Sequence, residues 1–182
     1  MERGNDMDLF DAISSRYCYR DGFRDEPVPR AALEKIVKAG LAAPSGKNAQ
    51  TSEFVIVDDP ELLGKIGEMH QIKAMHDAKA MIVCMVDREP PAVYEGHSFQ
   101  VEDLAAAVMC MLLAITSLGY ASVWIDGWLR RDERAERIGA LLDVPESKVV
   151  RILLPIGVPE TEGPRSEKRP FGERAWFNRY GT

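Results

Sequence analysis

One nearly uninterrupted apolar run constrains the fold most, and its spacing predicts a helix over residues 98–118. Ser98 can cap this helix, and Glu102 and Asp103 favour the positive end of its dipole. One stripe of the helix consists of Val101, Leu104, Ala105, Val108, Leu112 and Ile115. The other faces are also mostly apolar, through Met109, Met111, Leu113 and Ala114. A helix that is apolar all round is buried all round. In a chain of 182 residues this favours a helix shared with a second subunit, the alternative being the core helix of a monomer.

Helical and strand patterns alternate along the rest of the chain, which predicts an α+β layered domain. Helices are predicted over residues 7–15, 30–42, 61–68 and 131–142. Strands are predicted over residues 53–58, 80–86, 121–125 and 148–158. The strand over 80–86 is apolar throughout, so we expect it to be covered on both faces. No linker or repeat divides the chain, which predicts a single domain over residues 1–182.

Composition and missing motifs argue against several classes of protein. The net charge of −6 disfavours nucleic acid as a partner. The three cysteines and three histidines show neither C-x-x-C nor H-E-x-x-H spacing, so we expect no metal site. The polar start and the absence of an apolar run of about 20 residues predict a cytoplasmic protein with no membrane partner. Dinucleotide, P-loop and serine-hydrolase fingerprints are also missing.

Four short polar segments could bind a small ligand: residues 15–20, 44–50, 122–127 and 165–169. Arg16 and Arg20 are four residues apart at a predicted helix end, and arginine binds phosphate bidentately. Residues 44–50 could read the edge of a planar heterocycle. Gly127 follows a predicted strand, where glycine lets the backbone approach a ligand closely. Taken singly, residues 15–20 and 44–50 favour an ordinary solvated helix end and a polar loop, and the other two segments are compatible with a turn and a solvated charge run.

Taken in order, these segments resemble the nitroreductase family over residues 8–180. The shared motifs are Arg-x-x-x-Arg after a helix, Ala-Pro-Ser-x-x-Asn-x-Gln before a strand, Val-Glu-Asp near the start of the long helix, Leu-Gly-Tyr-Ala-Ser-Val-Trp-Ile-Asp-Gly, and Ile-Gly-Val-Pro followed by Lys-Arg-Pro-Phe. The resemblance implies a three-layer fold, with a central mixed β-sheet flanked by helices, in an intertwined homodimer. It also implies non-covalent FMN at the subunit interface. The aromatic tail, about residues 160–182, would dock on the partner subunit.

The resemblance also assigns residues to FMN. At the phosphate and ribityl end it places Arg16, Tyr17, Cys18, Lys168 and Arg169. Arg20 would face the pyrimidine edge, where a guanidinium stabilises the charge of the reduced ring. The backbone of Ile125, Asp126 and Gly127 would present an N–H group toward flavin N5, and Gln71 is a further candidate. The partner subunit would contribute Pro44, Ser45, Gly46 and Asn48. No side chain is expected to be catalytic, because flavin N5 carries the chemistry.

The implied activity is hydride transfer from NAD(P)H through the flavin to an electron-poor acceptor, a nitroaromatic or quinone, by a ping-pong mechanism. The alternatives are flavin storage or regulation, a related flavin enzyme such as a dehalogenase, dehydrogenase or flavin-degrading enzyme, and a flavin-free interaction domain.

The chain departs from the family pattern at three places. Cys18 stands where serine is usual, Thr51 and Ser52 replace a Pro-Trp pair, and the segment over residues 87–97 is short. A more open site, or one covered by Tyr94 and Phe99, would follow.

Overall fold

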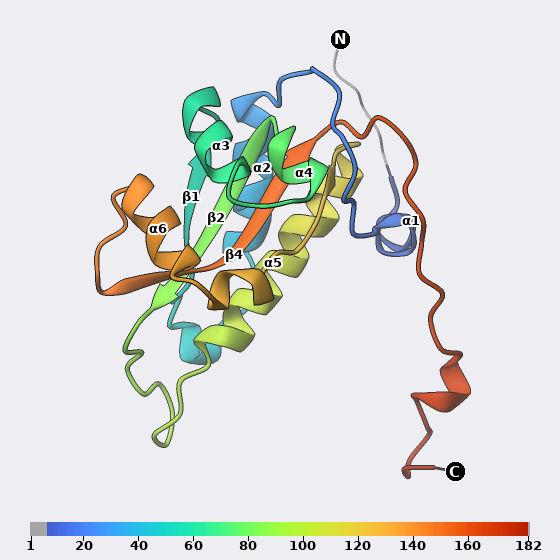
Figure 1. The fold of residues 1–182 in the computed structure, drawn as a ribbon. Helices are drawn as coiled ribbons and strands as arrows, with labels where there is room; N and C mark the ends of the chain where they lie inside the picture. The colour runs from blue at the N-terminus through green and yellow to red at the C-terminus, as the bar shows by residue number, and fades with distance from the viewer. Residues whose placement is uncertain (1–6, 182) are drawn as a thin grey trace.

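The computed structural model describes residues 7–181, which form a four-stranded sheet with helices on both faces (Figure 1). The elements in chain order are α1 (Leu9–Ser15), α2 (Arg30–Leu41), the 3₁₀ turn η1 (Gly46–Asn48), β1 (Glu53–Val57), α3 (Pro60–Gly67), α4 (Lys73–His76), β2 (Ala80–Asp87), α5 (Gln100–Ser117), β3 (Ala121–Ser122), η2 (Gly127–Arg130), α6 (Arg134–Leu141), β4 (Lys148–Gly157) and η3 (Phe171–Glu173).

The sheet has the strand order β1-β2-β4-β3, and its neighbouring strands pair antiparallel. The expected mixed character is limited to one parallel bridge between Cys18 and Ser122. There the chain after α1 runs beside β3, and the Tyr19 N–H donates to the Ser122 carbonyl at 2.9 Å. The parallel pairing goes no further because β3 is only two residues long. The N-terminal segment is nevertheless fixed against the sheet edge.

Strand β2 lies at the centre of the molecule and separates two apolar cores, which confirms that it is covered on both faces. Because side chains alternate along a strand, Met81 and Val83 enter one core and Ile82 and Cys84 enter the other. Helices α2 and α5 cover the second core, while α3, α4 and α6 cover the first. The expected three layers are therefore present.

Helix α5 begins at Gln100 with Phe99 at its N-cap position, one residue later than a cap at Ser98 predicts, although the Ser98 hydroxyl still accepts from the Gln100 N–H at 3.4 Å. Its 18 residues have a mean hydropathy of 1.4, enough by length and composition to cross a membrane, yet its inner face belongs to the core. Within one chain it is not buried all round, because Val101 and Met109 are 52% and 37% exposed. A partner subunit covering this outer face stays a prediction.

Three local predictions differ from the structure. The strand expected over 121–125 stops at Ser122, and Ile125 rejoins β4 only through a single bridge to Leu153. The helix expected over 131–142 begins at Arg134, because Asp132 and Glu133 have φ angles of 56° and 53° that a helix does not allow. The four-residue helix α4 was not predicted, since one turn carries no periodic signal.

Candidate functional site

The N-terminal segment brings two arginines to the edge of the sheet. Arg16 ends α1 in an extended conformation, so the chain turns away and runs beside β3. Its guanidinium is half-buried and forms no ion pair with any residue between 7 and 181. Arg16 lines a small cavity with Ser122, whose buried hydroxyl has no hydrogen-bond partner in the described chain. The Arg20 side chain is exposed, and within residues 7–181 its guanidinium donates to the Cys18 carbonyl alone, at 3.4 Å. Both cations are thus free to bind an anion.

The turn after Ile125 presents a free backbone donor beside a fixed carboxylate. Asp126 accepts two hydrogen bonds from Arg130, at 2.8 and 2.7 Å, and lies 3.5 Å from Arg151. The bonded Arg130 guanidinium lowers the pKa of Asp126 below its ordinary value. Gly127 begins η2, is exposed, and has open space where a side chain would lie. Its N–H donates to no acceptor among the described residues. A ligand atom could approach this N–H directly.

The loop between α3 and α4 joins these two segments. Its His70 ring packs on the Trp128 ring of η2 at a centroid distance of 4.6 Å. Burial lowers the pKa of His70, and the charges of Arg134 and His76 lower it further. From the other end of the loop, the Ala74 N–H donates to the Arg20 carbonyl at 3.3 Å. Gln71 is exposed between the two contacts. Three segments that are distant in sequence therefore meet on one side of the sheet, as expected for one binding surface.

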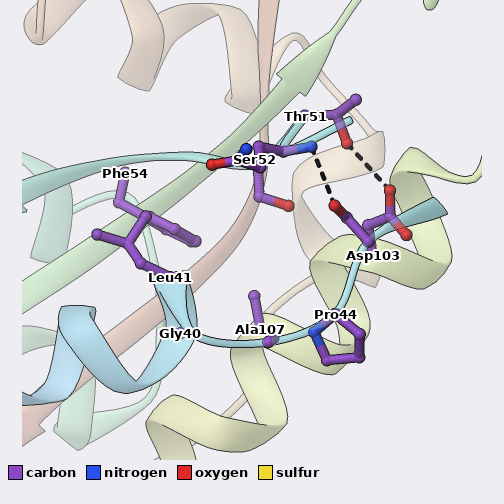
Figure 2. Close-up of a pocket in the computed structure, with 11 residues that line it drawn as sticks. Gly40, Leu41, Pro44, Thr51, Ser52, Phe54, Asp103 and Ala107 are labelled. Carbon is purple, nitrogen blue, oxygen red and sulfur yellow. Dashed lines mark hydrogen bonds between the residues drawn. The ribbon is translucent and has the colours of Figure 1, made fainter. Parts of the chain in front are cut away.

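The segment over residues 44–50 is fixed at the opposite end of α5. The Gly46 N–H donates to Asp103 at 2.9 Å. The Thr51 hydroxyl points to the other carboxylate oxygen at 3.4 Å (Figure 2). Asp103 is buried, at 7% exposure. A Cβ at position 46 would lie 2.6 Å from the Phe99 ring, so only glycine fits without movement. Pro44, Ser45, Gly46 and Asn48 are consequently held as one rigid loop.

A cavity of about 120 Å³ lies behind this loop, where Thr51 and Ser52 replace the usual Pro-Trp pair. Figure 2 shows Leu41 and Phe54 on one side of it and Asp103 on the other. The small side chains at positions 51 and 52 leave this space open. The structure thus places the departure from the family pattern next to the loop, between β1, α2 and α5.

The two groups of predicted site residues do not meet within one chain. The loop over 44–50 contacts α5 at Asp103, whereas the Arg16 cavity contacts α5 at Ile115. Twelve residues of helix separate these positions, which corresponds to about 18 Å. Within one chain, the two groups therefore line different pockets.

The C-terminal segment passes the N-terminal segment and then leaves the body of the domain (Figure 1). The Gly163 N–H donates to the Tyr17 hydroxyl at 3.2 Å, and the Arg165 guanidinium lies 5.7 Å from the centre of the Tyr17 ring. Lys168 and Arg169 are exposed, and no described contact joins them to Arg16. Within one chain, Arg165 is thus the basic tail residue that touches the predicted site.

The sequence pattern assigns no binding role to the Ser122 hydroxyl, although residues 122–127 are a candidate segment. For Asp103 it indicates a charge that favours the helix start and a place in the Val-Glu-Asp motif, whereas the structure shows a buried carboxylate that binds the loop. An acidic residue directly before the core residue Leu104 was the available signal. Across residues 7–181, no group of three His, Cys, Asp or Glu side chains is arranged to hold a metal ion.

Comparison with known proteins identifies the family. The model of the Nitroreductase family matches residues 13–73 and 68–158, and the chain belongs to that family. A protein of Methanothermobacter thermautotrophicus, provisionally named as an NADH dehydrogenase/NAD(P)H nitroreductase, is 33% identical over 161 residues, covering 87% of this chain and 82% of its own.

Two solved structures support the same fold. An FMN-dependent nitroreductase from Clostridium difficile superposes with a TM-score of 0.77 at 27% identity, covering 93% of this chain and 98% of its own. A nitroreductase from Desulfovibrio desulfuricans, solved in complex with FMN, gives a TM-score of 0.74 at 27% identity, covering 91% and 93%.

Proposed function

We propose that this protein is an FMN-dependent oxidoreductase that takes hydride from NAD(P)H and reduces an electron-poor acceptor, a nitroaromatic or quinone. The observation that carries the proposal is the half-buried Arg16 guanidinium, which forms no ion pair within residues 7–181 and lines a cavity with the unpaired Ser122 hydroxyl. The exposed Arg20 guanidinium and the Gly127 N–H add two further donors. Family membership and the FMN-bound neighbour support the same cofactor. Cytoplasmic localisation stays a prediction.

The donor set fits a flavin nucleotide. Arg16 is half-buried and has no ion pair in the described part of the chain, so it can hold a phosphate with little competition from carboxylates. Arg20, fixed through its own carbonyl, would hold negative charge at the pyrimidine edge. Gly127 would donate its N–H to the ring, since no side chain blocks the approach. Lys168 and Arg169 would join the phosphate through movement of the tail or from the partner subunit.

Bound FMN would supply hydride acceptance and donation at N5. The protein's own residues bind, orient and stabilise charge, and we expect none of them to act as a nucleophile. Donor and acceptor would use the same space in turn, which predicts ping-pong kinetics. The homodimer completes the site, because the loop over 44–50 lies too far along α5 to serve the same chain's Arg16.

Spectroscopy of the purified protein tests the proposal. We expect a yellow protein that absorbs near about 450 nm, bleaches with NADH or NADPH under argon, and recovers its colour on adding menadione or 4-nitrobenzamide. A colourless protein that fails to bind added FMN would refute the proposal. A yellow protein that neither nicotinamide reduces would instead favour flavin storage.

Removing the phosphate-binding cation tests the site assignment. Arg16→Ala should raise the dissociation constant for FMN roughly tenfold to hundredfold, as expected for a lost charge-assisted hydrogen bond. Arg137→Ala, an exposed arginine on α6, is the matched control and should bind FMN like the wild type. Equal FMN affinity in the two variants would mean that Arg16 does not hold the phosphate.

A further inference from the structure

Lys47 and Tyr94 form a cation–π pair at the tip of the rigid loop. The Lys47 Nζ lies 4.8 Å from the centre of the Tyr94 ring. Both side chains are exposed, and Tyr94 has 46% of its surface accessible. No carboxylate between residues 7 and 181 lies within ion-pair distance of Lys47. The pair is therefore a cation with an aromatic neighbour and no internal counter-ion.

Both halves of the pair stand on a fixed backbone. Lys47 has a φ of 51°, and the turn around it is held by the Gly46–Asp103 bond and by the Asn48 N–H donating to the Ser45 carbonyl at 2.9 Å. Tyr94 precedes a tight turn whose central residues, Glu95 and Gly96, have φ angles of 47° and 83°. The turn is closed by the His97 N–H, which donates to the Tyr94 carbonyl at 2.8 Å, so both halves of the pair lie on hydrogen-bonded turns.

We propose that the Lys47–Tyr94 pair recognises an anionic group on a planar substrate. The inference rests on the proposed function, which assigns residues 44–48 to the partner's flavin and so places Lys47 beside the substrate space. A tyrosine ring attracts the ammonium through its π face, which leaves N–H donors for a carboxylate or phosphate. The chain carries a net charge of −6 and repels anions at long range. An anionic ring would therefore bind to the protein more tightly beside Lys47, because this cation has no counter-ion within the described residues.

Two sources share this chemistry: an aromatic carboxylate on the acceptor and a phosphate of the nicotinamide donor. The acceptor is tested by calorimetric titration of the oxidised protein with 4-nitrobenzoate and with neutral 4-nitrobenzamide, without nicotinamide. We expect the wild type to bind the carboxylate roughly fivefold more tightly, which corresponds to the free energy of an exposed charge pair.

Lys47→Gln should remove this preference, and Lys47→Arg should retain it. Lys35→Gln, on the exposed face of α2, is the charge-matched control and should behave like the wild type.

The donor is tested by titrating the same proteins with NADH and NADPH in place of the aromatic acids. A preference for NADPH that Lys47→Gln abolishes would assign the pair to the donor's 2′-phosphate. If Lys47→Gln binds all four ligands with wild-type affinities, the proposal is overturned. Flavin absorbance tests the proposed function, and the calorimetric affinity ratios test the Lys47–Tyr94 pair. The two results are independent, because the ratios can be measured whether or not the protein is yellow.

Discussion

At the scale of single residues, Asp103 is the side chain that best explains how the candidate site is held. It is a buried carboxylate that accepts from the Gly46 N–H and lies beside the Thr51 hydroxyl. A buried polar group is costly unless it is bonded, so each partner stabilises the other. The loop over 44–50, with Lys47 and Asn48 at positive φ, is therefore kept in shape by a residue 57 positions away.

Asp103→Ala should lower the free energy of unfolding by about 1–3 kcal/mol, because the Gly46 N–H loses its acceptor. Urea denaturation followed by circular dichroism measures the change. Glu102→Ala, at the exposed neighbouring position, is the matched control. Equal midpoints for the two variants would show that the carboxylate does not hold the loop.

At the scale of elements, the contact between the α3–α4 loop and η2 depends on a neutral histidine. The His70 ring packs on Trp128, and burial lowers its pKa below the ordinary 6.5, with Arg134 and His76 adding to the effect. The folded protein therefore binds this proton less readily than the unfolded chain. The stabilising contribution is present above pH 6.5 and declines as the pH falls below that value toward the lowered pKa.

His70→Gln should flatten this dependence. Thermal unfolding measured between pH 7.5 and 5 should show the wild type losing stability faster than the variant below about pH 6.5. His97→Gln, an exposed histidine in the turn after Tyr94, serves as the control and should follow the wild type. Parallel curves for wild type and His70→Gln would contradict the prediction.

At the scale of the whole molecule, the two groups of predicted site residues lie along different parts of α5. Arg16 lies near Ile115 of α5 and the rigid loop lies near Asp103, so the helix separates them. Val101 and Met109 leave an apolar stripe exposed on the same helix. A homodimer packed through this stripe would explain both observations.

Complementation between two inactive variants tests this arrangement. Arg16→Ala and Asn48→Ala each damage both sites of a homodimer. A heterodimer of the two contains one intact site, because Arg16 of one chain meets Asn48 of the other. We expect co-expressed, doubly tagged heterodimers to hold about half the FMN of the wild type, measured by absorbance. Heterodimers as empty as the parent variants would mean that each chain builds its own site.

Much of the fold could be predicted because apolar periodicity records which faces are buried. The strands β1, β2 and β4 and the helices α2, α3 and α5 lie within about two residues of their predicted bounds. The motif order was sufficient to predict the family. Apolar periodicity did not predict two local features, the left-handed residues before α6 and the single-turn helix α4. Both depend on contacts that periodicity does not encode.

The sequence by itself determined the core, the three layers and the residue types available to bind a flavin, because burial and charge are properties of local pattern. Only the tertiary structure decided which of them meet. It joined the Arg20 carbonyl to Ala74 and the His70 ring to Trp128. It also bonded Gly46 to Asp103 and paired Lys47 with Tyr94. It also separated the loop over 44–50 from Arg16 by about twelve residues of α5. Distances between segments depend on how the layers pack, and no single stretch of sequence contains that information.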